Sequence, residues 1–124
     1  MRFEYTDEQR LIREATREFA ARELRIHARG WDAEGIFPPQ LIPKLAGLGL
    51  WGMIIPSDYG GSGLDALGMA LAIESLAWGD GGIALAVAAH NSLCCGHIVL
   101  AGAEQQKRTY LPRLPAAKLS ARGD

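Results

Sequence analysis

The sequence Ile83-Ala-Leu-Ala-Val-Ala-Ala-His-Asn-Ser-Leu-Cys-Cys-Gly-His-Ile-Val-Leu-Ala101 decides the fold of this chain. It contains no Lys, Arg, Asp or Glu, and a helix of its length would run roughly 28 Å, about the width of a small domain. Apolar residues fall on every face, which predicts a buried central helix. A polar patch at its middle, made by His90, Asn91, Ser92 and His97, should find hydrogen-bond partners or line a pocket.

A membrane-spanning helix of about 20 residues is the alternative interpretation of this stretch. We disfavour it because the polar patch would be costly in hydrocarbon, and the stretch holds nothing that would neutralise it. Other helices are therefore expected to wrap around the central one, and no membrane is expected as a partner.

The composition limits the remaining possibilities. A chain of 124 residues is typical of one domain. Its 13 basic and 14 acidic residues form no basic patch, which argues against nucleic acid as a partner. Adjacent cysteines in such a chain suggest reduced thiols and a cytoplasmic location. The polar N-terminus lacks the apolar core of a signal peptide.

Start and stop signals predict four more helices. Thr6 and Gln9 form a capping box, Pro38 and Pro39 suit a first turn, and Asp65 suits an N-cap. The predicted helices run from about Asp7 to Ala28, from Pro38 to a C-cap at Gly49, from about Ala66 to Ala77, and from Glu104 to Tyr110. Between them we expect a loop over Trp31–Phe37 and a flexible turn over Trp78–Gly82.

These elements predict an all-α fold. It would be an orthogonal or up-and-down bundle of four to five helices around the buried central helix, about Ile83–Ala101. Residues 1–114 would form one domain, and residues 115–124 a flexible tail. On the first helix, the expected packing side contains Leu11, Ile12, Ala15, Phe19 and Ile26. On the third, it contains Leu67, Ala70, Leu71, Ile73, Leu76 and Ala77.

Arginines along the first helix resemble a phosphate site at first sight. They are Arg10, Arg13, Arg17 and Arg22. Carboxylates interleave with them, and Glu18 and Arg22 are an i,i+4 pair. We therefore favour a solvated charged face.

A glycine motif offers a second phosphate-binding interpretation. Gly61-Ser-Gly-Leu-Asp-Ala66 fits G-x-G-x-x-A, the dinucleotide fingerprint. That fingerprint requires a parallel sheet, and only Met53–Ile55 resembles a strand. A tight glycine turn is the favoured interpretation.

Candidate ligands and catalysts are few. His90, Cys94 and His97 share one helical face and are of zinc-binding types, but one helix rarely supplies three ligands. We favour small core residues over a metal site. No nucleophile–base pair or paired carboxylates stand out, so no catalytic residue is assigned.

Six motifs in one order carry a family resemblance. They are Phe3-x-x-Thr-x-Glu-Gln9, Ile36-Phe-Pro38, Leu48-Gly-Leu-Trp-Gly52, Ile55-Pro-x-x-Tyr-Gly-Gly-Ser-Gly-Leu-Asp65, His90-Asn-Ser-Leu93 and Gly102-x-Glu-x-Gln-Lys-x-x-Tyr-Leu-Pro112. Their order and spacing resemble the N-terminal domain of acyl-CoA dehydrogenases, from Phe3 to about Leu114.

The resemblance implies a flavin enzyme with a helical N-terminal domain, a middle β-domain and a C-terminal helical bundle. Such enzymes use FAD and a glutamate base to oxidise acyl-CoA to 2,3-enoyl-CoA. They pass the electrons to an electron-transfer flavoprotein, and are usually homotetramers. The resemblance places Ala89, His90 and Leu93 in the wall of the acyl pocket.

The chain departs from the family pattern after Leu114, because the flavin-contacting motif of the family does not occur there. Neither a catalytic residue nor a cofactor-binding residue is therefore carried over, and we do not expect activity from this chain alone. Trp51, Met53, Ile54 and the exposed side of the central helix are expected to face the missing domains and to promote self-association. The alternative is a non-catalytic helical interaction module or a truncated product.

Overall fold

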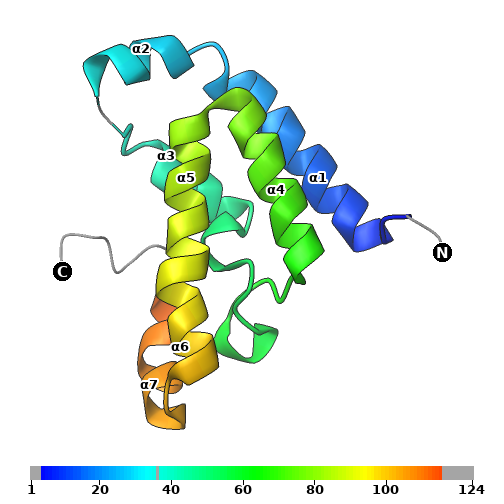
Figure 1. The fold of residues 1–124 in the computed structure, drawn as a ribbon, viewed down its shortest axis with the longest axis vertical. Helices are drawn as coiled ribbons and strands as arrows, with labels where there is room; N and C mark the ends of the chain where they lie inside the picture. The colour runs from blue at the N-terminus through cyan, green and yellow to red at the C-terminus, as the bar shows by residue number, and fades with distance from the viewer. Residues whose placement is uncertain (1–3, 36, 116–124) are drawn as a thin grey trace.

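The computed structural model describes residues 4–35 and 37–115, and within them all regular structure is helical. The α-helices, drawn in Figure 1, are α1 (Asp7–Phe19), α2 (Ala28–Glu34), α3 (Leu41–Gly47), α4 (Ala66–Gly79), α5 (Gly81–Ala89), α6 (Gly96–Ala101) and α7 (Glu104–Tyr110). One π-helical turn, Ala20–Leu24, extends α1, and another, His90–Cys95, joins α5 to α6. The predicted all-α class is confirmed.

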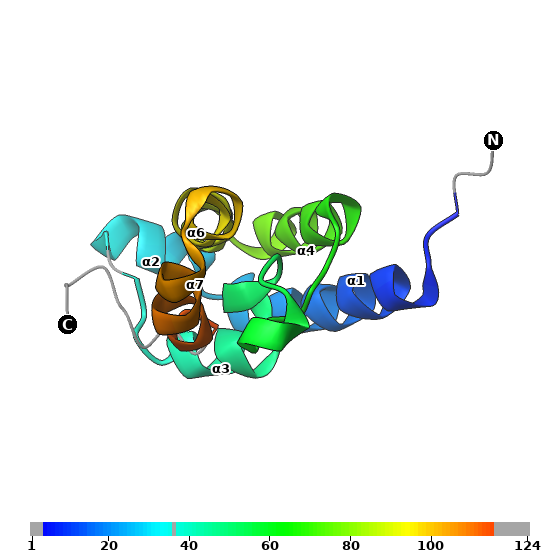
Figure 2. The same cartoon turned by 90° about the horizontal axis from the view of Figure 1, so that it is seen from below.

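The helices form two layers. Figure 2 shows α4 beside the continuous helix α5–α6 in one layer, with α1, α3 and α7 in the other. The core between them contains fully buried aliphatic side chains, among them Leu24, Leu45, Leu50, Leu76 and Val87. Burial of each such side chain contributes about 1.5–3 kcal/mol.

The central helix is buried on one side only. Ile83, Val87 and Cys95 face the core. On the opposite side the side chains of Leu85, Leu93 and Leu100 are 70%, 64% and 87% exposed. The predicted burial of the central helix therefore holds for one side only, because only one layer of helices packs against it.

Length and composition alone would let the helix Gly81–Ala101 cross a membrane, since its mean hydropathy is 1.7. The core helix of a soluble protein passes the same test. Here the middle of the helix is tied to the loop at Leu50 by the side chain of Asn91. We therefore interpret it as the core helix of a domain.

The first predicted helix is broken in two. After the π-helical turn, the chain makes a short turn and α2 then begins at Ala28. Trp31, predicted to lie in a loop, is inside α2, which ends at Gly35 with φ of +65°. The expected end before Gly30 is wrong. A glycine inside a helix, such as Gly30, costs only about 1 kcal/mol relative to alanine. The left-handed backbone conformation that ends a helix favours glycine, and Gly35 has that conformation.

The packing side of α1 also differs from the prediction. Thr16 and Phe19 are buried, whereas Leu11 is 67% and Ile26 75% exposed. The neighbouring helix α4 decides which side is covered. A Cβ atom added at Gly79 would lie 2.9 Å from the Cβ of Ala20, so the two helices cross closely at small residues.

The buried side of α4 is likewise made of smaller residues than expected. Gly68, Ala72 and Ser75 are buried together with Leu71 and Leu76. Leu67, assigned to the packing side from the sequence, is 47% exposed. Close approach of α1 favours small side chains at the contact.

Two polar residues fix the start of α1 and α4. Gln9 completes the predicted capping box, because its Oε1 accepts from the Thr6 amide at 2.9 Å and its own amide donates to Thr6 Oγ1. Its Nε2 also donates to Asp65 at 3.0 Å. Asp65 caps α4 by accepting from the Gly68 amide at 2.7 Å. Both predicted caps are confirmed, and Gln9 joins them.

The predicted flexible turn at Trp78–Gly82 is a one-residue corner instead. The Asp80 amide donates to Leu76 O at 2.8 Å and closes α4. The Asp80 carboxylate accepts from the amides of Gly82 and Ile83 at 2.8 and 3.1 Å and opens α5. Because Asp80 both ends α4 and caps α5, no flexible segment separates the two helices.

The remaining helix ends agree with the sequence signals except the start of α3, which is predicted at Pro38 and comes three residues later. Pro38 and Pro39 precede α3, which begins at Leu41, and Gly49 comes after it with φ of +75°. The bounds of α7 agree with the prediction. The predicted tail lies outside the described residues except for Pro115, so the domain boundary stays a prediction.

Candidate functional site

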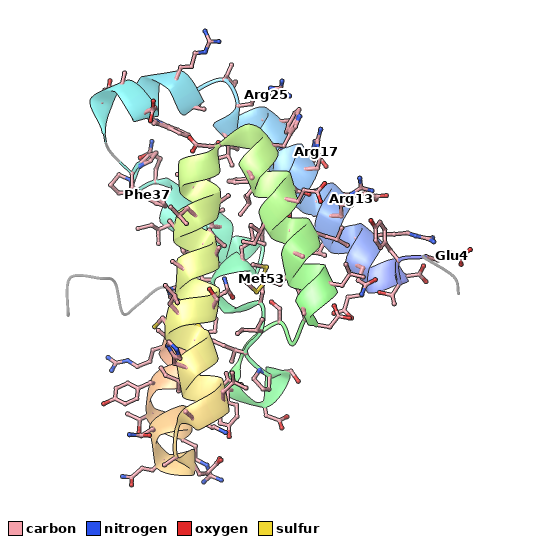
Figure 3. All side chains as sticks on the ribbon, viewed as in Figure 1. Glu4, Arg13, Arg17, Arg25, Phe37 and Met53 are labelled. Atoms are coloured by element: carbon pink, nitrogen blue, oxygen red, sulfur yellow. The ribbon has the colours of Figure 1, made fainter. Side chains whose placement is uncertain are left out.

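A large apolar groove runs along one side of the central helix. Its volume is about 1010 Å³, at the upper end of the range for small-molecule sites. The side chains of Phe37, Ile42, Trp51, Tyr110 and Leu114 form the wall that faces the helix. Figure 3 shows Phe37 close to α3 and α5.

The three predicted pocket residues all line this groove. Ala89 and His90 are half-buried, and the Leu93 side chain is 64% exposed. Ala86 and His97 lie on the same face of the helix, one turn before and one turn after these residues, and they also line the groove. The structure brings the predicted residues together in one cavity, and their binding of substrate stays a prediction.

The sequence interpretation missed the wall opposite the helix. Phe37, Ile42 and Leu114 come from three separate segments, and no periodicity relates them to the central helix. Extending the helical phase from Ala89 would have found Ala86 and His97. Only the tertiary fold finds the others.

His90 sits at the inner edge of the groove. Its Nε2 lies 3.2 Å from Leu114 O, and its ring meets the Trp51 ring edge-on, with centroids 5.1 Å apart. Desolvation lowers the pKa of His90, against the raising effect of the backbone of Leu114 and Trp51. The imidazole is therefore neutral at pH 7 and suits an apolar cavity.

Asn91 explains the polar patch at the centre of the helix. Its side chain is fully buried and donates to Leu50 O at 2.7 Å and Val87 O at 2.9 Å. Its Oδ1 accepts from the Met53 amide at 2.8 Å. The carboxamide thus satisfies backbone groups of the loop after α3, and buried groups of this kind are costly when left unpaired.

The π-helical turn His90–Cys95 places residues on both sides of the helix. Asn91 and Cys95 enter the core, whereas His90, Leu93 and Cys94 face the groove. A π-helical turn contains one extra residue and so shifts the phase of the next helical segment, and such turns are frequent at functional sites.

The amides at the start of the glycine motif are already hydrogen-bonded to the chain's own carbonyl groups. The amides of Ser62, Gly63 and Leu64 donate to Gly52 O, Ile55 O and Met53 O at 2.9, 2.9 and 2.6 Å. A Cβ atom at Gly61 would lie 2.1 Å from Ile55 O, so this close return of the loop requires glycine. The tight turn is the correct interpretation.

The two cysteines differ in environment. Cys94 is exposed and lines the groove, whereas Cys95 is buried beside Trp51 O. Burial raises the pKa of Cys95 to about 12, so its thiol stays protonated. Among the described residues, no three His, Cys, Asp or Glu side chains gather as a metal site.

Trp51 and Met53 are buried in the core, which differs from the prediction. The sequence predicts that they face missing domains, yet they are 5% and 0% exposed. Trp51 Nε1 donates to Ile42 O at 3.0 Å. The exposed apolar side of the central helix, which is also predicted, is present at Leu85, Leu93 and Leu100.

Comparison with known proteins assigns the family. Residues 6–118 match the acyl-CoA dehydrogenase N-terminal domain family. The chain belongs to the acyl-CoA dehydrogenase family. It is 41% identical over 114 residues to the probable acyl-CoA dehydrogenase YngJ of Bacillus subtilis, covering 92% of this chain and 30% of that protein. The chain therefore spans about 30% of the length of such a relative.

Solved structures share this acyl-CoA dehydrogenase fold. The butyryl-CoA dehydrogenase of Megasphaera elsdenii matches with a TM-score of 0.87 and 35% identity, over 95% of this chain and 32% of that one. A glutaryl-CoA dehydrogenase of Mycobacterium smegmatis in complex with FADH2 matches with a TM-score of 0.83 and 32% identity, over 92% of this chain and 29% of that one. A chain in the structure of the electron transferring flavoprotein of Acidaminococcus fermentans matches with a TM-score of 0.87 and 35% identity. The match covers 94% of this chain and 30% of that one.

The described part of this acyl-CoA dehydrogenase domain fits an acyl chain better than a flavin. The groove is apolar, whereas the amides of the glycine loop are already bonded within the loop. FAD carries a pyrophosphate that needs donors. We therefore assign no cofactor-binding residue to the described residues.

Proposed function

We propose that this domain supplies one wall of the acyl-binding cavity in a flavin-dependent acyl-CoA dehydrogenase. The apolar groove beside Ala89, His90 and Leu93 carries the proposal, because a hydrocarbon tail gains about 0.8 kcal/mol for each CH₂ buried. The complete protein would oxidise acyl-CoA to 2,3-enoyl-CoA.

Each wall residue has a distinct role in this proposal. Ala89 leaves room for the distal part of the tail, and Leu93, one turn further along, contacts it. His90 contributes a neutral ring, because desolvation keeps its pKa low. Among the described residues that line the groove there is no Asp or Glu, so the base that removes the α-proton would come from another part of the protein.

The remaining chemistry belongs to domains beyond this one. FAD would take the hydride, and an electron-transfer flavoprotein would accept the electrons. The structural neighbours with FADH2 and with an electron transferring flavoprotein support these two assignments. The family's usual homotetramer is the assembly that we propose. On this proposal the present chain alone is inactive and stays colourless on purification.

A domain-replacement experiment tests the proposal. The middle and C-terminal domains of Bacillus subtilis YngJ, which is 41% identical over the shared region, would be fused after this domain. We expect a yellow protein that reduces a dye with butyryl-, octanoyl- or isovaleryl-CoA. A folded, flavin-loaded chimera that turns over no acyl-CoA would contradict the proposal, and YngJ itself is the positive control.

A further inference from the structure

Two arginines enclose one tryptophan at the end of α4. The guanidinium carbon of Arg17 lies 3.7 Å from the ring centroid of Trp78, and that of Arg25 lies 4.1 Å from it. Both guanidinium groups therefore lie within cation–π distance of the same ring. Cation–π stacking of this kind holds planar guanidinium groups in place while their N–H donors stay at the edge.

The π-helical turn Ala20–Leu24 makes this stack possible. In a regular α-helix, residues eight apart differ in direction by about 80°. One extra residue in the turn makes the separation from Arg17 to Arg25 equivalent to about two full turns. Both side chains therefore point to the same side of the helix, where Trp78 lies.

Arg13 extends the pair into a row. It lies one turn before Arg17, with its guanidinium carbon 5.8 Å from the Tyr5 ring centroid. Figure 3 shows Arg13, Arg17 and Arg25 in line along α1 and its extension. We call these three residues the arginine row; it is exposed and roughly 18 Å long.

The arginine row differs from the other arginines of α1. Arg10 and Arg22 form ion pairs with Asp7 and Glu18, at 4.0 and 3.8 Å. Within residues 4–35 and 37–115, no carboxylate lies within 4.0 Å of an arginine of the row. Arg10 is close to Arg17 in helical phase but is paired with Asp7, so what distinguishes the row is that its arginines have no such ion pair among the described residues.

We propose that the arginine row is a docking surface for an acidic, extended segment of another protein. Charge complementarity identifies the partner, because guanidinium groups held by aromatic rings bind carboxylates through paired N–H donors. The length of the row suits several carboxylates in sequence rather than one small anion. Glu74 is exposed one turn before Trp78 on α4, and it forms no ion pair with an arginine of the row.

An octaglutamate peptide is the probe that tests this docking surface. Calorimetric titration at low ionic strength should show binding to the 124-residue chain, weakening as salt is added. Arg17→Gln and Arg25→Gln should each weaken binding roughly tenfold or more. Arg22→Gln is the matched control, since it removes the same charge from the same helix outside the row, and should change the affinity less than twofold.

Several results would overturn the proposal. Equal weakening by Arg22→Gln and Arg17→Gln would mean that the peptide binds any basic surface of the chain. Failure of the unmodified chain to bind the peptide would also reject the docking surface. So would tighter, Arg17-dependent binding to phosphatidylserine vesicles or polyuridylate, which would assign the row to a lipid surface or a nucleic acid.

Discussion

The buried carboxamide of Asn91 accepts a hydrogen bond from the Met53 amide at 2.8 Å and so joins the central helix to the loop beneath it. Figure 3 shows Met53 between α4 and the central helix. The same side chain donates to Leu50 O and Val87 O. The Asn91 side chain therefore fixes the loop after α3 against the central helix, both in the core and next to the groove.

Asn91→Ala should be strongly destabilising. It leaves the Met53 amide and Leu50 carbonyl buried without their partner, at a cost of about 2–4 kcal/mol in the free energy of unfolding. Urea denaturation measures this loss. Ser92→Ala, next in sequence but exposed, is the control and should change stability by less than about 0.5 kcal/mol. Equal effects of the two substitutions would contradict this role of Asn91.

Two glycines should respond in opposite directions to alanine. At Gly79 the new Cβ would lie 2.9 Å from Ala20 Cβ and 3.0 Å from Leu24 Cβ, so Gly79→Ala should cost about 1–3 kcal/mol. Gly30 lies inside α2 with nothing within 4 Å of an added Cβ. Gly30→Ala should stabilise by about 0.5–1 kcal/mol. Thermal denaturation of both variants checks this, and a neutral Gly79→Ala would show that α1 and α4 cross less closely.

His90 should make stability depend on pH. Its folded-state pKa lies below its unfolded value of about 6.5, so the unfolded chain binds the proton first. The contribution is complete above about pH 6.5 and is lost as the pH falls from there toward the folded pKa. The lowered pKa values of Glu23 and Glu104 start from 4.5, so their effects come at lower pH.

Urea denaturation at about pH 7.5 and about pH 5.5 isolates this histidine. The loss of stability between the two should be smaller in His90→Gln than in the unmodified chain. His97→Gln is the control, because His97 is exposed on the same helix. An unchanged pH dependence in His90→Gln would show that desolvation of this ring is unimportant.

The two thiols should react at different rates. Exposed Cys94 should label rapidly with a disulfide reagent, whereas buried Cys95, with a pKa raised to about 12, should react only on unfolding. Cys94→Ser should therefore remove the fast phase entirely. Rapid labelling of both thiols in the folded chain would mean that Cys95 is accessible.

Ala89→Phe should shift chain-length preference in the chimera with the YngJ domains. The larger ring fills the groove, and discrimination per methylene is about 1–3 kcal/mol. The kcat/KM should fall for long acyl-CoA substrates more than for short ones, with the flavin spectrum unchanged. Leu85→Phe is the control, since Leu85 is 70% exposed and outside the groove. The same profile in both variants would place the acyl chain elsewhere.

Local signals in the sequence determined where most helices begin and end. The capping box at Thr6, the N-cap at Asp65 and the glycines after α3 and α6 act through hydrogen bonds and backbone angles within a few residues. Such effects are readable without the fold. The ordered family motifs likewise identified the domain, which the match over residues 6–118 confirms.

Only the tertiary structure decided which faces are covered. Periodicity could not show that α4 would bury Thr16 and leave Leu11 exposed, or that Trp51 would turn into the core. The wall of the groove opposite the central helix joins Phe37 and Tyr110, which lie far apart in sequence. These outcomes depend on how closely helices approach one another, and that is set by side-chain shape across long-range contacts rather than by any local pattern.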